Sequence, residues 1–252
     1  MSTTGTAQPR VEVCPDREAL GRQAGDDIAG ELRTRLARQD GVRVIFAAAP
    51  SQLETLERLR VAEGIDWGRV TAFHMDEYLG LPPGAPQHFG EWLKAAFFDH
   101  VPLAKVHLLE PDGDAAGSVR RYAEELATAP IDLVVLGIGV NGHLAFNDPP
   151  DVDLDDPRPV RVVELAAASR RQQVDDGLFD RLEDVPTKAV TLTVPRLLDA
   201  GRLFCVVPGA AKADAVRAAL NDPIGPACPA TALRRHADCT LYLDKESAAH
   251  VR

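Results

Sequence analysis

The hydrophobic pattern of this chain switches repeatedly between a helical period and short apolar runs. Leu20, Ile28, Leu32 and Leu36 form an apolar stripe at helical spacing. Val42 to Ala48 is an apolar run of the kind expected for a buried parallel strand. Helix and strand signals alternate in this way along the chain, which is typical of α/β proteins.

The remaining elements follow the same alternation. Further strands are expected at Val70 to Phe73, Ile131 to Leu136, Ala189 to Val194, Leu203 to Val207 and Thr240 to Leu243. Further helices are expected from Ser51, where Glu54 completes a capping-box pattern, and over Glu91 to Phe98, Val119 to Ala127 and Lys212 to Leu220. The pattern therefore predicts an α/β fold with a mainly parallel, Rossmann-like sheet and helices on both faces.

Two segments fall outside this alternation. Residues 1–10 are polar and predict a flexible tail, so that a single domain would span residues 11–252. Residues 147–160 contain Pro149 and Pro150 followed by an acidic run, which rules out a regular helix. A long irregular loop beside a strand end predicts a lid or a binding loop.

Composition narrows the class of protein. The 252 residues carry a net charge of −10, which disfavours nucleic acid and acidic membrane surfaces as partners. The chain opens on a polar stretch, and no apolar segment reaches the ~18 residues of a membrane span. The four cysteines show neither C-x-x-C pairs nor zinc-binding spacing, so reduced thiols and a cytoplasmic protein are expected. The sequence leaves the oligomeric state open, a homo-oligomer included.

Side chains suited to catalysis follow two of the expected strands. Asp76, Glu77 and Tyr78 come directly after the strand that ends at Phe73. Ligands of parallel α/β sheets bind beyond the carboxyl ends of the strands, so either carboxylate could serve a site there. Alternatively, Asp76 or Glu77 could simply cap the next turn.

The second such segment follows the strand that ends at Leu136. Gly137, Gly139 and Gly142 permit a sharp turn and a close approach to a ligand, and they bring His143 to the strand's carboxyl end. The three glycines also satisfy G-x-G-x-x-G. A dinucleotide site would need a helix opening on the third glycine, whereas a Pro-Pro pair follows soon afterwards. A catalytic histidine is therefore favoured over a dinucleotide loop.

Together, Met75-Asp76-Glu77-Tyr78 and the run from Gly137 to Pro149 resemble the glucosamine-6-phosphate isomerase/deaminase family, within the wider group that includes the 6-phosphogluconolactonases. The resemblance covers roughly residues 15–245. It implies an enzyme that opens the ring of a hexosamine 6-phosphate, moves a proton between C2 and C1, and releases ammonia. It implies no metal and no other cofactor, and a small sugar phosphate as the partner.

The resemblance also implies roles for individual residues. Asp76 matches the family's base, and His143 matches the group that opens the sugar ring. Asp148 stands where the family usually has Glu and would hold the imidazole, while Asn141 could orient His143 or the substrate. Further substrate contacts are implied for three residues of the same motifs: Glu77, Gly139 and Gly142.

The phosphate-binding part of the family pattern is altered. Ala49 and Ser51 lie where the family offers backbone N–H groups at a helix N-terminus, but Pro50 has none to offer. Gly177 stands at or near the place where many members carry an arginine for the phosphate. Lys212 keeps the family's strand–turn–lysine arrangement and can meet an anion as a point charge.

Two other functions stay open at this stage. A lactonase-like hydrolase would turn over a lactone without releasing ammonia. A non-catalytic sugar-phosphate sensor is disfavoured because Asp76 and His143 are both present. The altered phosphate loop leaves the identity of the sugar undecided.

Overall fold

The computed structural model describes residues 8–111 and 113–251. Its main sheet has seven parallel strands in the order β1-β10-β9-β6-β2-β3-β5. These strands span Arg10–Cys14 (β1), Val42–Phe46 (β2), Val70–His74 (β3), Lys105–His107 (β5), Ile131–Leu136 (β6), Ala200–Val207 (β9) and Cys239–Asp244 (β10). The expected parallel sheet is confirmed. Residues 1–7 of the expected tail lie outside the described residues, and Arg10 already belongs to β1.

Helices cover both faces of this sheet. They span Arg17–Leu36 (α1), Leu53–Arg60 (α2), Phe89–Ala96 (α3), Ala115–Ala127 (α4), Ala167–Asp175 (α5), Val194–Leu198 (α6) and Ala213–Asn221 (α7). Successive side chains of a strand point into different apolar clusters. In β6, Leu133 and Val135 pack with α1, α2 and α3, whereas Val134 and Leu136 pack with α4, α6 and α7.

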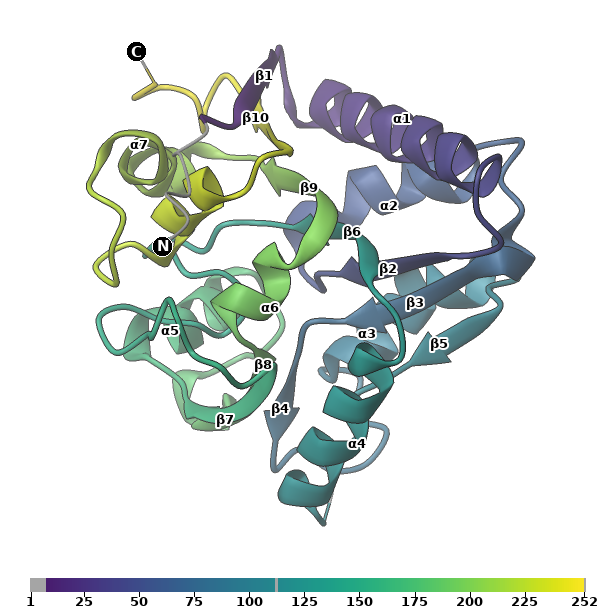
Figure 1. Ribbon diagram of the computed structural model, residues 1–252. Helices are drawn as coiled ribbons and strands as arrows, with labels where there is room; N and C mark the ends of the chain where they lie inside the picture. Colours follow the sequence, from purple (N-terminus) through teal and green to yellow (C-terminus); the bar gives the residue numbers. More distant parts are fainter. Residues whose placement is uncertain (1–7, 112, 252) are drawn as a thin grey trace.

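Helices α1 and α2 lie side by side (Figure 1). Their backbones approach closely because α1 has glycine at the contact: a Cβ atom on Gly21 would lie 2.4 Å from the Cβ atom of Glu54. The contact fixes the position of the α2 N-terminus, which borders the site described below.

A second, antiparallel sheet stands beside the first, in the order β4-β8-β7. Its strands span Asp76–Leu79 (β4), Lys188–Leu192 (β8) and Val160–Glu164 (β7). The strand expected at residues 189–194 therefore exists, but it pairs with β4 and β7 instead of joining the parallel sheet. A strand buried on both faces has the same hydrophobic pattern in either sheet, so the pattern could not decide between them. Only Met75 separates β3 from β4, so the chain passes from one sheet to the other at this point.

Two helix starts differ from the sequence prediction. Pro50–Gln52 form a 3₁₀ turn, α2 begins at Leu53, and no side chain caps it, so the capping-box prediction for Ser51 was wrong. A proline at the first position favours such a tight turn. Lys212 likewise ends a 3₁₀ turn just before α7 instead of lying inside the helix. No helix among the described residues has the length and apolar character needed to cross a membrane.

Candidate active site

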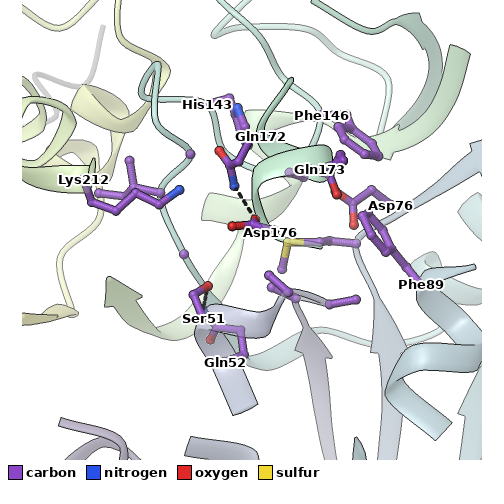
Figure 2. Close-up of a pocket in the computed structure, with 18 residues that line it drawn as sticks. Ser51, Gln52, Asp76, Phe89, His143, Phe146, Gln172, Gln173, Asp176 and Lys212 are labelled. Carbon is purple, nitrogen blue, oxygen red and sulfur yellow. Dashed lines mark hydrogen bonds between the residues drawn. The ribbon is translucent and has the colours of Figure 1, made fainter. Parts of the chain in front are cut away.

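A cavity that is partly open to solvent lies at the carboxyl ends of the central strands (Figure 2). Its walls come from the segments that follow β2, β3, β6 and β9, together with α5. The strand order reverses here, because β2 neighbours β3 on one side and β6 on the other. Such a reversal is the usual ligand site of an open α/β sheet, as the sequence argument expected.

His143 is held at this edge by the glycines around it. A Cβ atom on Gly139 would lie 2.1 Å from Cε1 of the His143 ring, so only glycine lets the imidazole pack against this backbone. Gly142 has a φ of +82°, a left-handed conformation that glycine adopts without strain, and it turns the chain into His143. Gly139 lines the cavity, whereas Gly142 lies outside it. Gly142 therefore shapes the turn instead of facing a ligand.

The Nδ1 atom of His143 is enclosed by polar partners. It lies 2.7 Å from Asn141 Oδ1, 2.9 Å from Ser169 Oγ and 3.3 Å from Asp148 Oδ1. Asn141 Nδ2 donates to Asp148 Oδ1 at 3.0 Å, and the Ser169 hydroxyl donates to the same oxygen. Asn141 and Asp148 thus lie behind the histidine, outside the cavity wall.

Asp148 is ionised at neutral pH in this setting. Burial by itself raises the pKa of Asp148, but hydrogen bonds with His143, Asn141 and Ser169 outweigh burial and hold that pKa at about 2. The carboxylate charge is therefore available to polarise the imidazole. Because Nδ1 is engaged within the fold, Nε2 is the ring nitrogen that remains for a ligand in the cavity.

Asp76 faces the cavity from the first position of β4. Its side chain lies beside Phe89 and Phe146, whose stacked rings have centroids 5.6 Å apart. Among the described residues, neither carboxylate oxygen of Asp76 has a hydrogen-bond donor, and the residue is 6% exposed. Burial, and then the neighbouring Glu77 charge, raise the pKa of Asp76 well above its ordinary value. A buried carboxylate without donors is a stronger base than one in water.

Glu77, the adjacent acid, points the other way. Its carboxylate accepts hydrogen bonds from the backbone N–H groups of Phe89 at 3.1 Å and Gly90 at 3.0 Å, which caps the first turn of α3. His88 Nδ1 lies 3.2 Å from the same carboxylate. Burial raises the pKa of Glu77, but the bond with His88 and these backbone bonds outweigh it and lower that pKa. The capping alternative thus describes Glu77 and not Asp76, and Glu77 lies outside the cavity wall.

Lys212 enters the cavity opposite Asp76 (Figure 2). Its ammonium forms no ion pair with any residue in the described part of the chain. Burial lowers the pKa of Lys212 to about 8, although attraction to Asp176 acts in the other direction. Ala49 and Ser51 also line this cavity, with Ser51 in the 3₁₀ turn before α2. Three residues with implied phosphate contacts are therefore brought to one cavity.

Helix α5 supplies one wall of the cavity. No residue from 147–160 lines it, so the interpretation of that loop as a lid or a binding loop stays a prediction, while its irregular structure up to β7 is confirmed. Gln172, Gln173 and Asp176 line the cavity instead. Gln172 accepts from Val140 N at 3.0 Å and donates to Asp176 Oδ2 at 3.2 Å.

Several of these contributions had no clear signal in the sequence. The hydrophobic pattern of α5 gives no sign that Ser169, Gln172 and Gln173 are buried. Gln173 is fixed by the Tyr78 hydroxyl, which donates to its Oε1 at 2.8 Å. Arg170 does not replace the missing phosphate arginine, because it donates to the carbonyls of Leu182 and Val185.

Nowhere in residues 8–111 and 113–251 do three His, Cys, Asp or Glu side chains gather as metal ligands.

The sequence model of the glucosamine-6-phosphate isomerases/6-phosphogluconolactonases matches residues 15–242. The chain belongs to this family. A glucosamine-6-phosphate deaminase from Exiguobacterium sibiricum is 34% identical over 220 residues, which is 86% of this chain and 85% of that protein. One from Bacillus thuringiensis is 36% identical over 186 residues, which is 73% of this chain and 68% of that protein.

Solved structures of the family share the fold. A monomeric glucosamine-6-phosphate deaminase superposes with a TM-score of 0.87 at 26% identity, covering 96% of this chain and 99% of that one. The 6-phosphogluconolactonase of Thermotoga maritima superposes with a TM-score of 0.74 at 20% identity, covering 94% and 99%. Both branches of the family therefore have this architecture, and the lactonase match speaks for the fold alone.

Proposed function

We propose that this enzyme converts glucosamine 6-phosphate and water to fructose 6-phosphate and ammonia. The observation that carries the proposal is the convergence of Asp76, His143 and Lys212 on one cavity. These side chains supply a base with a raised pKa, an imidazole with one nitrogen facing the ligand, and an ammonium for an anion. Relatives at 34–36% identity are named glucosamine-6-phosphate deaminases, which favours the deaminase over the lactonase reaction.

Ring opening is assigned to His143. Nε2 of the imidazole takes the proton of the anomeric hydroxyl and delivers it to the ring oxygen, so that the C1–O5 bond breaks and C1 becomes an aldehyde. The Asp148 charge behind the ring stabilises the imidazolium formed between the two transfers. The histidine ends in its starting form, so it can act in every turnover.

Proton transfer between carbons is assigned to Asp76. The carboxylate removes the proton from C2 and returns it to C1. In the same step the C1 oxygen gains a proton and the substrate ammonium loses one, so that C1 becomes a CH2OH group and a protonated C=N bond forms at C2. Water adds to C2 and ammonia leaves, giving the ketone of fructose 6-phosphate. The apolar wall of Phe89 and Phe146 supports this role, because it keeps water from lowering the basicity of Asp76.

The phosphate is assigned to the side of the cavity with Lys212 and Ser51. The ammonium contributes a charge-assisted hydrogen bond, and the Ser51 hydroxyl and the backbone near Ala49 contribute further donors. Lys212 has no ion pair within the described residues, which supports a ligand as its partner. The four cysteines are free, which supports the proposal of a cytoplasmic protein.

Ammonia and fructose 6-phosphate should be assayed together after incubation of the purified protein with glucosamine 6-phosphate. We expect both products in equal amounts, with loss of both in Asp76→Asn and in His143→Gln. Substrate carrying deuterium at C2 should transfer part of the label to C1, because one carboxylate removes and returns the proton.

A parallel assay with 6-phosphogluconolactone separates the two branches of the family. Turnover of the lactone without any ammonia from glucosamine 6-phosphate would overturn the proposal in favour of the hydrolase. Lack of turnover with either compound, in a protein whose circular dichroism shows it folded, would redirect the search to other hexosamine phosphates.

A further inference from the structure

Ser169 lies between the imidazole of His143 and the carboxylate of Asp148, the two groups assigned to the proposed ring-opening step. It lies in the first turn of α5 and is 0% exposed. Its Oγ atom is 2.9 Å from His143 Nδ1 and hydrogen bonds to Asp148 Oδ1. A serine hydroxyl can donate one hydrogen bond and accept others, so it can link an N–H donor to a carboxylate.

The direct contact between Asp148 and the imidazole is long. Asp148 Oδ1 lies 3.3 Å from Nδ1, beyond the usual length of a charge-assisted N–H···O bond. Aspartate is one methylene shorter than the glutamate expected at this place. The gap is bridged on one side by the Ser169 hydroxyl and on the other by the Asn141 amide, at 2.7 Å from Nδ1 and 3.0 Å from Asp148.

The carboxylate decides the direction of these hydrogen bonds. Asp148 is ionised and can only accept, so Asn141 must turn its Nδ2 group and Ser169 its O–H toward it. Asn141 then presents its carbonyl oxygen to His143, and Ser169 presents a lone pair. Both bridging groups are acceptors toward Nδ1, so the neutral imidazole carries its hydrogen on Nδ1. Its lone pair is on Nε2, which faces the cavity.

We propose that Ser169 is a positioning residue that couples Asp148 to His143 through its hydroxyl and holds the imidazole in the form with Nδ1 protonated. The effect on ring opening rests on the proposed function, whereas the protonated nitrogen is a property of the free enzyme. The side-chain amide of Asn141 also links Asp148 to His143 and favours the same form of the imidazole. A hydroxyl that donates to the carboxylate is polarised by it, and its oxygen becomes a stronger acceptor for Nδ1–H. The imidazolium that forms during ring opening is stabilised in this way.

Nitrogen NMR of the His143 ring in the substrate-free enzyme tests the inference directly. We expect the neutral wild-type ring to carry its hydrogen mainly on Nδ1. In Ser169→Ala, the share of the form protonated on Nε2 should rise. A wild-type ring protonated mainly on Nε2 would overturn the proposal, whichever sugar phosphate proves to be the substrate.

Kinetics with glucosamine 6-phosphate give the second readout. Ser169→Ala should lower kcat about tenfold to a hundredfold and leave KM within about twofold, because the hydroxyl acts on the imidazole and not on the sugar. Ser169→Thr keeps the hydroxyl and should recover most of the lost kcat. Ser118→Ala removes another buried helical serine, one outside the site, and serves as the matched control.

The outcomes are distinguishable. Unchanged kcat and an unchanged NMR spectrum in Ser169→Ala would overturn the coupling. A loss of kcat that Ser118→Ala reproduces, with a matching fall in melting temperature, would assign Ser169 a structural role only. If the extra methyl of Ser169→Thr disturbs packing, Ser169→Cys takes its place and should recover less, because a thiol is a weaker donor. Absence of turnover in the wild type would refute the proposed reaction and leave the NMR result as the test of Ser169.

Discussion

Asp148 behind His143 and the two charged groups inside the cavity, Asp76 and Lys212, are all at least partly buried, but they differ in the partners that the fold gives them. Behind the histidine, Asp148 has donors from Asn141, Ser169 and the backbone N–H of Ala166. Its pKa is consequently held at about 2. Inside the cavity, Asp76 and Lys212 have no ion-pair partner among the described residues. Burial raises the pKa of Asp76 and lowers that of Lys212 to about 8.

The difference separates a charge whose hydrogen-bond partners are all within the protein from charges that are left for a ligand to contact. Hydrogen bonds within the fold keep Asp148 fully charged, which suits a group that orients a neighbour. Burial without partners shifts the pKa values of Asp76 and Lys212 toward their neutral forms. For Asp76 this suits a group that takes up and returns a proton. For Lys212 it suits a group that binds a phosphate in place of water. Changes behind His143 should therefore alter kcat and weaken the fold. Changes inside the cavity should alter catalysis or binding without weakening it.

Asp76→Asn should show the largest effect. Loss of the base should lower kcat about a thousandfold or more. The free energy of unfolding should rise near neutral pH, because the variant no longer carries a buried carboxylate without hydrogen-bond donors. This gain in stability follows from the raised pKa of Asp76 in the folded protein. Between the unfolded pKa of about 3.9 and the folded pKa, the unfolded chain binds fewer protons than the folded one. The wild type therefore loses stability as pH rises through this range, and the variant does not.

Urea unfolding of wild type and Asp76→Asn at several pH values measures that stability difference. The gain should vanish below about pH 4, where Asp76 is protonated in both states. A variant less stable than the wild type at neutral pH would show that Asp76 is paired after all and would remove the contrast with Asp148.

Asp148→Asn should act in the opposite direction on stability. The folded pKa of about 2 lies below the unfolded value, so the ionised carboxylate contributes about 2 kcal/mol, fully present above about pH 4 and lost as pH falls through about 2. The variant should lose this amount near neutral pH and lower kcat about tenfold to a hundredfold. The same urea series measures it, and equal stabilities of variant and wild type would count against the hydrogen-bonded network.

How far the sequence predicts this site depends on whether a residue belongs to a local pattern. Strand β6 was placed correctly at both ends because Pro130 precedes its apolar run and Gly137 follows it. Asp76 and His143 could be singled out because each comes soon after an expected strand end and lies in a family motif, and both line the cavity. The antiparallel sheet was not found, because its pairs, such as Asp76 with Thr191, join distant parts of the chain.

The contributions of α5 were beyond reach for the same reason. Ser169 stands in a run of alanines and arginines, and its importance comes from contacts 26 residues away with His143 and 21 residues away with Asp148. Glu77 shows the converse. It lies inside a family motif, yet its carboxylate caps α3. A motif therefore marks a site without saying which of its residues face the ligand.

Lys212→Met should raise KM about tenfold to a hundredfold and change kcat less. This factor corresponds to the free energy that a hydrogen bond to a charged group contributes. For the wild type, affinity for fructose 6-phosphate should fall as pH rises through about 8, because the ammonium loses its proton there. Calorimetric titration between about pH 7 and pH 9 measures this, since the phosphate is already fully ionised. Lys212→Arg stays charged over the range and is the control. If the arginine variant shows the same pH dependence, another group is responsible.

Asp176→Asn should have the smallest effect and the opposite sign. Asp176 is exposed at the cavity wall and lies near Lys212, where its negative charge opposes an incoming phosphate. Asparagine keeps an acceptor for Gln172 Nε2 and removes the repulsion, so KM should fall about twofold to fivefold. The gain should shrink at high salt, because charges exposed to solvent are screened. Steady-state kinetics at low and high ionic strength test this, with Asp175→Asn, the neighbouring exposed acid outside the cavity wall, as the matched control. A rise in KM would instead mean that Asp176 contacts the substrate, for instance its amino group, and that this side of the cavity recognises more than the phosphate.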